Sequence, residues 1–471
     1  MTRISRRLLA DALRVADFLT VIAAGGIAFL LYVVHFLDAA YQNIYYLTAT
    51  AVAAGVYLAI AYALEAYRYD RLSDLSYLVR RSMAALGSMA LIWLIVAFAT
   101  KTTEFWSRGW VLIWLGCSLV MLIAWRVTLA VAIRHWRSAH RWQDRIVLVG
   151  ATEIAARLVQ DIRQRGADDA EIVGVFDERG SSRNPDMKGM PVFGNVEALL
   201  EFTRYNYVDC VVVALPWSNE ERILRLSEKL SVLPVDINVA FPTQTLHHRI
   251  RGWDSAYGVP LMQIAARPLT DRQVFLKRLE DVVLTSIIAV AVAPVLLLVA
   301  LAIKIESRGP ILFRQPRHGF NNTTFDIYKF RTMFVDKGDV SGRERTRVND
   351  PRVTRVGRFL RRWSIDELPQ LLNVLRGEMS LIGPRPHPVG MRAADADYRE
   401  VVANYAARHR MRPGITGWAQ VAGFRGEAET IEKARRRVEF DLEYIANWSL
   451  LFDARILALT LVAVIGGKGA Y

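Results

Sequence analysis

Residues 282–303 read "VVLTSIIAVAVAPVLLLVALAI", an unbroken apolar run that decides how the second half of the chain meets a membrane. A helix of this length is long enough to cross a bilayer, which takes about 20 apolar residues. Basic residues nevertheless flank the run on both sides, with Lys277 and Arg278 before it and Lys304 and Arg308 after it. Because Lys and Arg are retained on the cytoplasmic side, a complete crossing is disfavoured.

Pro294 lies near the middle of this run, where a proline removes a backbone hydrogen bond and clashes with the preceding turn. We therefore expect a re-entrant helix hairpin over residues 278–304 that enters the membrane, bends at Pro294 and returns to the same side. The residues that mark this element are Lys277, Arg278, Asp281 and Pro294. The alternative is a proline-kinked span, since proline is common in transmembrane helices.

Four further apolar runs occupy the first part of the chain, at residues 18–37, 44–64, 82–100 and 109–125. Each is close to the length of a transmembrane helix, so the sequence predicts a four-helix transmembrane bundle over residues 1–138. Arginines gather before the first run, between the second and the third, and after the fourth. Both ends of the bundle are therefore expected on the cytoplasmic side.

The middle of the chain, residues 139–265, alternates predicted strands and helices, as in "RIVLVGATEIAARLVQDIRQRG". This alternation predicts a parallel sheet covered on both faces, that is, a degenerate Rossmann-like α/β domain. The glycine fingerprint for a dinucleotide is degenerate, because only Gly150 remains and Thr152 and Ala155 hold the other positions. Asp177 is a candidate ribose contact or an ordinary turn residue. The domain is either nucleotide-binding or structural and regulatory.

The chain carries a net charge of +14, which suits nucleic acid, anionic lipid or a phosphorylated substrate. The apolar runs favour the lipid bilayer and phosphate as partners. No nucleic-acid-binding motif accompanies the charge, so no nucleic acid partner is expected. The two cysteines, Cys117 and Cys210, support neither a disulfide nor a cysteine metal site.

The segment "SIDELPQLLNVLRG", residues 364–377, places the pair Asp366 and Glu367 at the start of a predicted helix. One interpretation is a capping box between Ser364 and Glu367, with Pro369 tolerated in the first turn. The other is a reaction centre, because arginines crowd the segment at positions 352, 355, 358, 361, 362 and 385. A carboxylate held among arginines can bind magnesium together with substrate phosphates, or attack phosphorus itself.

Several motifs occur in order over residues 271–471: "PILFRQPRHG", "FDIYKFRTM", "RRWSIDELPQLLNVLRGEMSLIGPRPHP", "RHRMRPGITGWAQVAGFRGE" and "DLEYIANWSLLFDARIL". This part of the chain resembles the bacterial sugar transferase family, the polyprenyl-phosphate hexose-1-phosphate transferases, in its large multidomain branch. The resemblance implies an α-rich catalytic domain over residues 266–471. It also implies transfer of hexose 1-phosphate from a UDP-hexose, preferably UDP-glucose, to undecaprenyl phosphate, with Mg²⁺ and release of UMP.

The resemblance also implies roles for individual residues. Asp366 would be the nucleophile that forms an aspartyl-phosphosugar and would contact the metal, and Glu367 would orient or deprotonate. The remaining assignments are phosphate binding by Arg361, Arg385, Lys329 and Arg331, and a nucleotide-sugar region around Thr416, Gln420 and Arg425. Two departures from the family pattern occur, Ala293 in place of a serine before the kinking proline, and Asn322 in place of a turn glycine.

The resemblance also implies a multi-pass protein of the bacterial inner membrane. Its N-terminus, Rossmann-like domain and catalytic domain would lie in the cytoplasm. It would initiate exopolysaccharide, capsule or O-antigen synthesis. A homodimer is a further expectation. Three rivals remain: another donor such as UDP-galactose, a nucleotide-sugar dehydratase, and a membrane scaffold that senses nucleotides without catalysis. The dehydratase is disfavoured because we find no Tyr-x-x-x-Lys pair after residue 270. Near the C-terminus, Tyr444 and Trp448 suggest either an in-plane amphipathic helix or ordinary helix packing.

Overall fold

The computed structural model describes residues 5–35, 43–68, 71–72, 74–101, 106–138, 143–164, 170–178, 190–240, 261–335, 350–389, 392–393, 396–398, 402, 404–424 and 430–465. The chain divides into two compact units, Met1–Gln143 and Asp144–Tyr471. Five helices in the described residues are long and apolar enough to cross a membrane. Four of these helices belong to the first unit, and the fifth belongs to the second.

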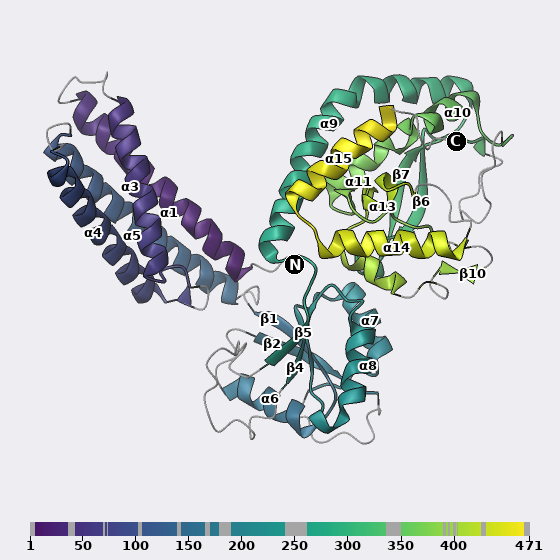
Figure 1. Ribbon diagram of the computed structural model, residues 1–471, viewed down its shortest axis with the longest axis horizontal. Helices are drawn as coiled ribbons and strands as arrows, with labels where there is room; N and C mark the ends of the chain where they lie inside the picture. The colour runs from purple at the N-terminus through teal and green to yellow at the C-terminus, as the bar shows by residue number, and fades with distance from the viewer. Residues whose placement is uncertain are drawn as a thin grey trace. The chain divides into compact units, whose positions relative to one another are not determined.

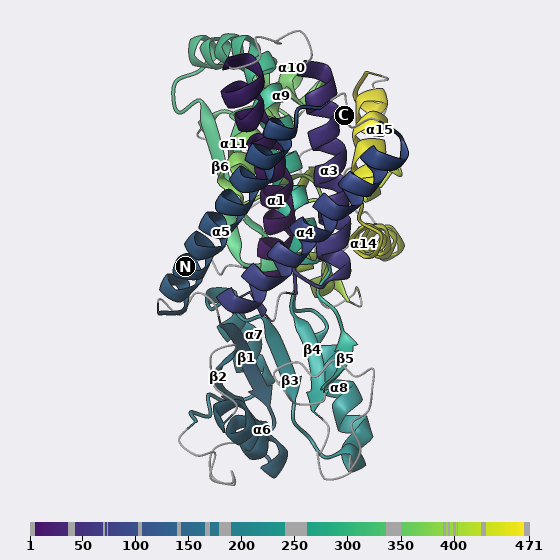
Figure 2. The same ribbon diagram turned by 90° about the vertical axis from the view of Figure 1, so that its left-hand side faces the viewer.

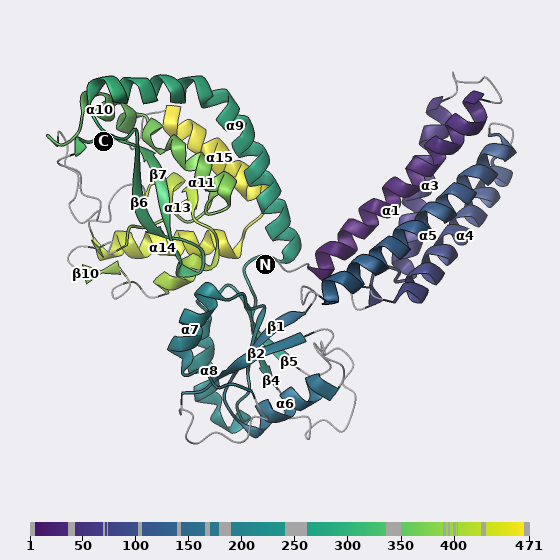
Figure 3. The ribbon, with the colours of Figure 1, turned by 180° about the vertical axis from the view of Figure 1, so that it is seen from behind.

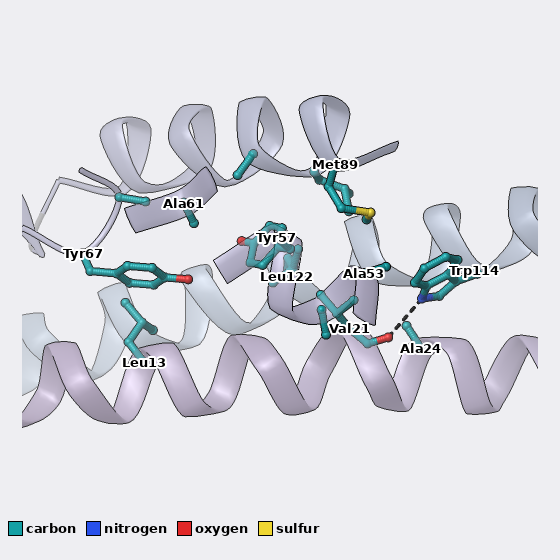
Figure 4. Close-up of a cluster of buried hydrophobic side chains, with 14 of the residues drawn as sticks. Leu13, Val21, Ala24, Ala53, Tyr57, Ala61, Tyr67, Met89, Trp114 and Leu122 are labelled. Carbon is teal, nitrogen blue, oxygen red and sulfur yellow. Dashed lines mark hydrogen bonds between the residues drawn. The ribbon is translucent and has the colours of Figure 1, made fainter. Parts of the chain in front are cut away.

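The first unit consists of α1 (Arg6–Ala28), which continues as the π-helix η1 (Phe29–Val34), then α3 (Asn43–Ala63), α4 (Leu75–Ala99) and α5 (Arg108–Ser138). These helices pack around one apolar core (Figure 4). Within it, the Trp114 indole donates a hydrogen bond to the Val21 carbonyl over 3.0 Å, so a polar group of the core is satisfied inside the bundle.

An ion pair also lies inside the bundle, where Arg126 Nη2 and Asp17 Oδ2 are 2.6 Å apart and both side chains are fully buried. The Tyr67 hydroxyl donates to the same carboxylate, and the guanidinium donates to Ser82 Oγ. A buried pair of this kind needs such additional hydrogen bonds, because removing two charges from water is costly. The pair therefore ties α1 to α5.

The second unit begins with a five-stranded sheet in the order β2-β1-β3-β4-β5 (Figure 2). Its strands are β1 (Asp144–Val149), β2 (Ala170–Phe176), β3 (Cys210–Val213), β4 (Asp236–Ala240) and β5 (Leu261–Ala265). The first four are parallel, as predicted, and β5 adds an antiparallel edge that was not predicted. Separate apolar clusters cover the two faces, one with α6 (Glu153–Gln164), the other with α7 (Val196–Tyr205) and α8 (Glu220–Leu230).

The loop after β1 is closed by the domain's own side chains. Gly150 has a φ of +102°, and the Thr152 hydroxyl donates to the Ala214 carbonyl over 2.6 Å. The Asp177 carboxylate is buried and accepts from the Ala151 amide over 2.7 Å. This hydrogen bond favours the interpretation of Asp177 as an ordinary turn residue, because its carboxylate is engaged with the loop backbone.

The rest of the second unit is built on α9 (Asp271–Glu306) and the antiparallel strands β6 (Leu312–His318) and β7 (Thr324–Phe330). The turn between the strands contains η8 (Phe320–Asn322), in which Asn321 and Asn322 both have positive φ, as expected for the position where the family has a glycine. The elements that follow are α10 (Arg355–Arg362), η10 (Ile365–Gln370), α11 (Leu371–Arg376), β8 (Ser380–Ile382), β9 (Arg392–Ala393), β10 (Ala396–Asp397), η11 (Tyr405–Arg410), β11 (Gly414–Thr416), α13 (Trp418–Val421), α14 (Ile431–Ala446) and α15 (Leu450–Ile465).

Helix α9 is a single helix with Pro294 inside it, and it begins with a capping box between Thr270 and Gln273. Figure 1 and the opposite view in Figure 3 show that it bends over the helices and strands of residues 312–465, the expected catalytic region, rather than running straight. A proline within a helix is a common cause of such a bend. Most apolar side chains of its central part are exposed, including Val290, Leu297 and Leu298.

Helix α15 is exposed along one face at Leu451, Leu461 and Val462. Its other face buries Asp453 and Ile456. Tyr444 and Trp448 are both buried and donate hydrogen bonds to the Asp453 carboxylate over 2.8 and 2.9 Å. For these two aromatic residues, ordinary helix packing is therefore the correct alternative.

Candidate active site

The pair Asp366 and Glu367 lies on η10, a 3-10 helix that connects α10 to α11. Ser364, just before it, has a φ of +55°, and its side chain forms no capping hydrogen bond. The predicted capping box between Ser364 and Glu367 is therefore wrong. A capping serine needs extended backbone angles, whereas Ser364 is in the left-handed conformation.

The Glu367 carboxylate is held by two cations. Lys329 Nζ on β7 donates to Oε1 over 2.8 Å. Arg385, in the loop after β8, donates from Nη2 to Oε1 over 2.5 Å and from Nη1 to Oε2 over 3.2 Å. This two-point arginine contact fixes the carboxylate in direction as well as in position. Three separate segments thus converge on Glu367.

Asp366 differs from its neighbour. Its side chain is 9% exposed, and within the described part of the chain its carboxylate accepts no hydrogen bond and forms no ion pair. Lys329, Arg361 and Arg385 are close enough to act on it electrostatically. The site therefore offers one carboxylate with free lone pairs surrounded by positive charge.

The two carboxyl groups have opposite pKa shifts. Burial raises the pKa of Asp366 above its ordinary value, and the adjacent Glu367 charge adds to this, while Lys329 and Arg361 act against it. Burial also disfavours the charged form of Glu367, but Arg385 and Lys329 outweigh it and hold the pKa of Glu367 well below its usual range. Glu367 is therefore ionised and engaged in ion pairs, so it is suited to orienting its neighbours rather than to taking up a proton.

Among the described residues, positive charge exceeds negative charge around the pair. Arg361 donates from Nε to the Thr332 hydroxyl over 2.9 Å, so its position is fixed from the segment after β7. Burial, together with the nearby Arg385, lowers the pKa of Lys329 and brings the pKa of Arg317 to about 9. Both effects arise because the cations are crowded in a partly dry site. An anion placed among them would relieve this repulsion.

Sequence reasoning did not assign Arg317 and Arg408 to the site. Arg317 Nη1 donates to the Pro386 carbonyl over 3.1 Å, and Arg408 Nη2 donates to the Arg385 carbonyl over 2.6 Å. Arg408 is itself paired with Asp441 at 2.8 Å. These two residues thus hold the backbone beside Arg385. Both residues lie in motifs that the sequence analysis singled out. Their spacing in the sequence, however, does not reveal that they contact the loop that contains Arg385.

Arg331, another predicted phosphate ligand, is bonded to the segment that follows α9. Its guanidinium donates to the Ser307 and Arg308 carbonyls and to the Ser307 hydroxyl, each over 2.8 Å. These groups follow the last residue of α9, so Arg331 holds the C-terminal end of that helix. Both terminal nitrogens take part in this contact, and a phosphate-binding role for Arg331 stays a prediction.

The predicted nucleotide-sugar region is only partly described. The Thr416 hydroxyl pairs with the Thr460 hydroxyl on α15 at 2.8 Å, and Gln420 donates to the Ile415 carbonyl over 3.2 Å. Arg425 lies outside the described residues. A role for Thr416 and Gln420 in binding the nucleotide sugar stays a prediction, as does any role for Arg425.

The marked residues at the start of α9 face the catalytic region. Asp281 accepts from the Ser380 hydroxyl and from the Leu381 amide, which fixes α9 to β8. Lys277 lies 2.6 Å from Asp453 of α15. Arg278 donates to two carbonyls at the end of α11. The start of α9 is therefore bound to three elements of the catalytic region.

The donor set can be compared with the needs of Mg²⁺, which prefers one or two carboxylates together with water and substrate phosphates. Asp366 offers one such carboxylate, whereas that of Glu367 is occupied by Lys329 and Arg385. Among the described residues, no group of three or more His, Cys, Asp or Glu side chains is arranged to hold a metal ion. The residues therefore fit Mg²⁺ as a single-carboxylate site that substrate phosphates would complete.

Comparisons with known proteins cover both units of the chain. The bacterial sugar transferase family model matches residues 272–467, and a CoA-binding domain model matches residues 62–240. The chain is 40% identical to the undecaprenyl-phosphate glucose phosphotransferase of Komagataeibacter xylinus over 70% of its own length and 61% of that protein. It thus spans less than two thirds of that relative.

Two other relatives are covered more fully, and both are named UDP-glucose:undecaprenyl-phosphate glucose-1-phosphate transferase. The protein of Escherichia coli is 37% identical over 76% of each chain. That of Xanthomonas campestris is 33% identical over 98% of this chain and 94% of its own. With the site around Asp366 lying inside the matched region, the chain belongs to the bacterial sugar transferase family of phosphoglycosyl transferases.

Proposed function

We propose that the chain transfers glucose 1-phosphate from UDP-glucose to undecaprenyl phosphate, releases UMP, and thereby begins exopolysaccharide, capsule or O-antigen synthesis. The observation that carries the proposal is the contrast between Asp366 and Glu367. Among the described residues the Asp366 carboxylate accepts no hydrogen bond, whereas the Glu367 carboxylate is held by Lys329 and Arg385. The names of the relatives support the donor and the acceptor.

In the first step, an Asp366 carboxylate oxygen forms a bond to the phosphorus that carries glucose. The bond between that phosphorus and the oxygen bridging to the uridine phosphate breaks, and UMP leaves with the bridging oxygen and its electron pair. The enzyme then holds glucose 1-phosphate as an aspartyl-phosphosugar. Covalent catalysis of this type divides one difficult displacement into two easier ones.

In the second step, a phosphate oxygen of undecaprenyl phosphate bonds to the same phosphorus, and the bond to Asp366 breaks. The product is undecaprenyl-diphospho-glucose, and the carboxylate is regenerated. The Asp366 carboxylate and the phosphate of undecaprenyl phosphate both attack in their ionised forms. Neither step therefore needs a base to remove a proton from the attacking oxygen. Glu367 therefore acts by orienting Lys329 and Arg385, which bind the charged oxygens of the transferred phosphoryl group.

Arg361 and Arg385 are the proposed phosphate ligands, with Lys329, and their surplus charge attracts both anionic substrates. Mg²⁺, held by Asp366 and the diphosphate, would neutralise charge on the departing UMP. Thr416, Gln420 and Arg425 remain proposed contacts of the nucleotide sugar.

We further propose that the helices of the first unit form a four-helix transmembrane bundle and that α9 is re-entrant. The bend of α9, which contains Pro294, and the contacts of both ends of α9 with the catalytic region support a hairpin, because a spanning helix would separate its ends by the membrane. Both folded domains would then lie in the cytoplasm of a bacterium, beneath its inner membrane. A homodimer is proposed on the family resemblance alone.

The test is transfer of radiolabel from UDP-glucose to undecaprenyl phosphate in membranes that contain the full chain, with Asp366→Asn alongside. The proposal predicts label in the lipid extract with the wild-type chain and none above background with the variant. UDP-galactose, in a parallel reaction, tests the rival donor. If no UDP-hexose yields labelled lipid, the proposal is refuted, and the result favours the rival hypothesis of a membrane scaffold without catalysis.

A further inference from the structure

One helix, α9, caps both of the helices that flank the Asp366 turn. Near its C-terminal end, the Glu306 carboxylate accepts from the amides of Arg355 over 2.7 Å and Val356 over 3.0 Å. These amides belong to the first two residues of α10. The contact joins residues that are 49 positions apart in the chain.

The other end of α9 makes the complementary contact. Arg278 donates from Nη1 to the Val374 carbonyl over 2.5 Å and from Nη2 to the Leu375 carbonyl over 2.6 Å. Both carbonyls lie in the last turn of α11, just before Gly377, which ends the helix with a φ of +82°. Two side chains of α9 therefore bond to four backbone groups of the helices around the active site, one of which, the Val374 carbonyl, also accepts from the Gly377 amide over 2.9 Å.

The signs of the two charges match the helix ends. The first amides of a helix lack partners and carry partial positive charge, whereas the last carbonyls carry partial negative charge. Glu306 supplies an anion at the start of α10, and Arg278 supplies a cation at the end of α11. Each contact therefore adds electrostatic attraction to its two hydrogen bonds, and each fixes the position of one helix relative to α9.

The turn that carries Asp366 lies between these two fixed helices. Only residues 363–370 separate the end of α10 from the start of α11, and Ser364 within them is in a left-handed conformation. A connection this short transmits a shift of either helix to the Asp366 carboxylate. Along a straight helix, 28 residues would place Arg278 and Glu306 about 42 Å apart. Because α9 bends, both its ends reach the same catalytic region (Figure 1).

We propose that Glu306 and Arg278 are positioning residues through which the inserted helix α9 sets the orientation of Asp366. The proposal rests on the function proposed above, with Asp366 as the attacking group. In that function the nucleophile must lie at a fixed depth relative to a lipid-bound phosphate. The two caps connect the element that is embedded in lipid to the turn that performs the reaction.

The experiment compares Glu306→Ala, Glu306→Gln and Arg278→Ala with the wild-type full chain in lipid nanodiscs. Glu432→Gln, which removes an exposed carboxylate from α14, is the matched control. The readouts are kcat, KM for UDP-glucose and the melting temperature. A small misplacement of a reacting group lowers the rate of reaction far more than it lowers binding, so kcat in Glu306→Ala should fall by at least about tenfold while KM changes by less than about twofold.

Glu306→Gln retains one acceptor oxygen but no charge, so its kcat should lie between that of Glu306→Ala and that of the wild type. Arg278→Ala should lower kcat in the same way as Glu306→Ala. The inference is overturned if Glu306→Ala lowers the melting temperature but keeps wild-type kcat, because the contact would then only support the fold. Asp366→Asn in the same assay keeps the two proposals apart. If Asp366→Asn is fully active, Asp366 is not the nucleophile. If Asp366→Asn is inactive and Glu306→Ala is fully active, only the positioning role is refuted.

Discussion

Asp366 and Glu367 are consecutive residues, yet in the part of the chain that the structure describes the Glu367 carboxylate forms ion pairs and the Asp366 carboxylate forms none. Lys329 and Arg385 hold the Glu367 carboxylate at 2.8 and 2.5 Å, while Asp366 makes no comparable contact in the described part of the chain. The two carboxylates share one site but have different surroundings, and these surroundings suit them to different roles. One is oriented and permanently ionised, and the other is available to react.

Glu367→Gln should weaken catalysis and change its pH dependence. The loss of charge leaves Lys329 and Arg385 without their anion, so both side chains lose the geometry that binds phosphate. We expect kcat to fall by about tenfold to a hundredfold. The Glu367 charge also contributes to the raised pKa of Asp366, so the acidic limb of the pH–rate profile should move to lower pH. An unchanged profile would contradict the coupling of the two carboxyl groups.

The wild-type enzyme should lose activity on acidification at a pH above that expected for an ordinary aspartate. Attack on phosphorus needs the ionised form of Asp366, and burial raises the pKa of this group above 3.8. The rate should therefore fall as the pH drops through the raised pKa of Asp366. The measurement is the rate of UMP release against pH in a single turnover. A rate that stays constant down to the pH at which a solvent-exposed aspartate titrates would refute this prediction.

Asp453→Ala should destabilise the catalytic region. Asp453 is fully buried, and it accepts from Lys277, Tyr444 and Trp448. The substitution breaks a buried ion pair and leaves the Tyr444 and Trp448 donors without their acceptor, while Glu280 and Asp281 remain 3.4 Å from Lys277. We expect a cost of about 3 kcal/mol. The measurement is thermal melting in detergent. Glu439→Ala, which removes one exposed partner of Arg435, is the control and should cost less than about 1 kcal/mol.

The orientation of the chain can be tested with single cysteines in a background that lacks Cys117 and Cys210. Glu432→Cys on the exposed surface of α14 should react with an impermeant reagent only after the membrane is opened. Lys101→Cys, after the end of α4, should react in intact cells, because it lies in a predicted external loop. Labelling of Glu432→Cys from outside would exclude a re-entrant α9.

The sequence was sufficient where short-range patterns control the outcome. Strand and helix alternation predicted the parallel sheet, and Pro294 predicted that the long apolar helix bends. The re-entrant course inferred from the flanking charges stays a prediction. The motif order placed Asp366, Glu367, Lys329 and Arg385 in one site. These features depend on periodicity, on a single strong helix-bending residue and on a family resemblance.

Contacts between distant segments were not predictable in the same way. The spacing of Ser364 and Glu367 matches a capping box, but the pattern cannot reveal that Ser364 is left-handed. Arg331 follows β7 in a motif with Lys329, yet its partners are at the end of α9. Glu306 carries no local signal at all, because its role is created by the approach of α10. In each case tertiary structure decides which group a polar side chain meets.

The most direct test of the central claim is to look for glucose 1-phosphate bound to Asp366. Purified full-length protein would be mixed with UDP-glucose labelled in the phosphate next to glucose, without undecaprenyl phosphate, and analysed by intact-protein mass spectrometry and peptide mapping. The account predicts release of UMP, label on the peptide containing Asp366, transfer of that label when undecaprenyl phosphate is added, and no label in Asp366→Asn. Label on Asp366→Asn, or wild-type transfer to lipid by that variant, would contradict it.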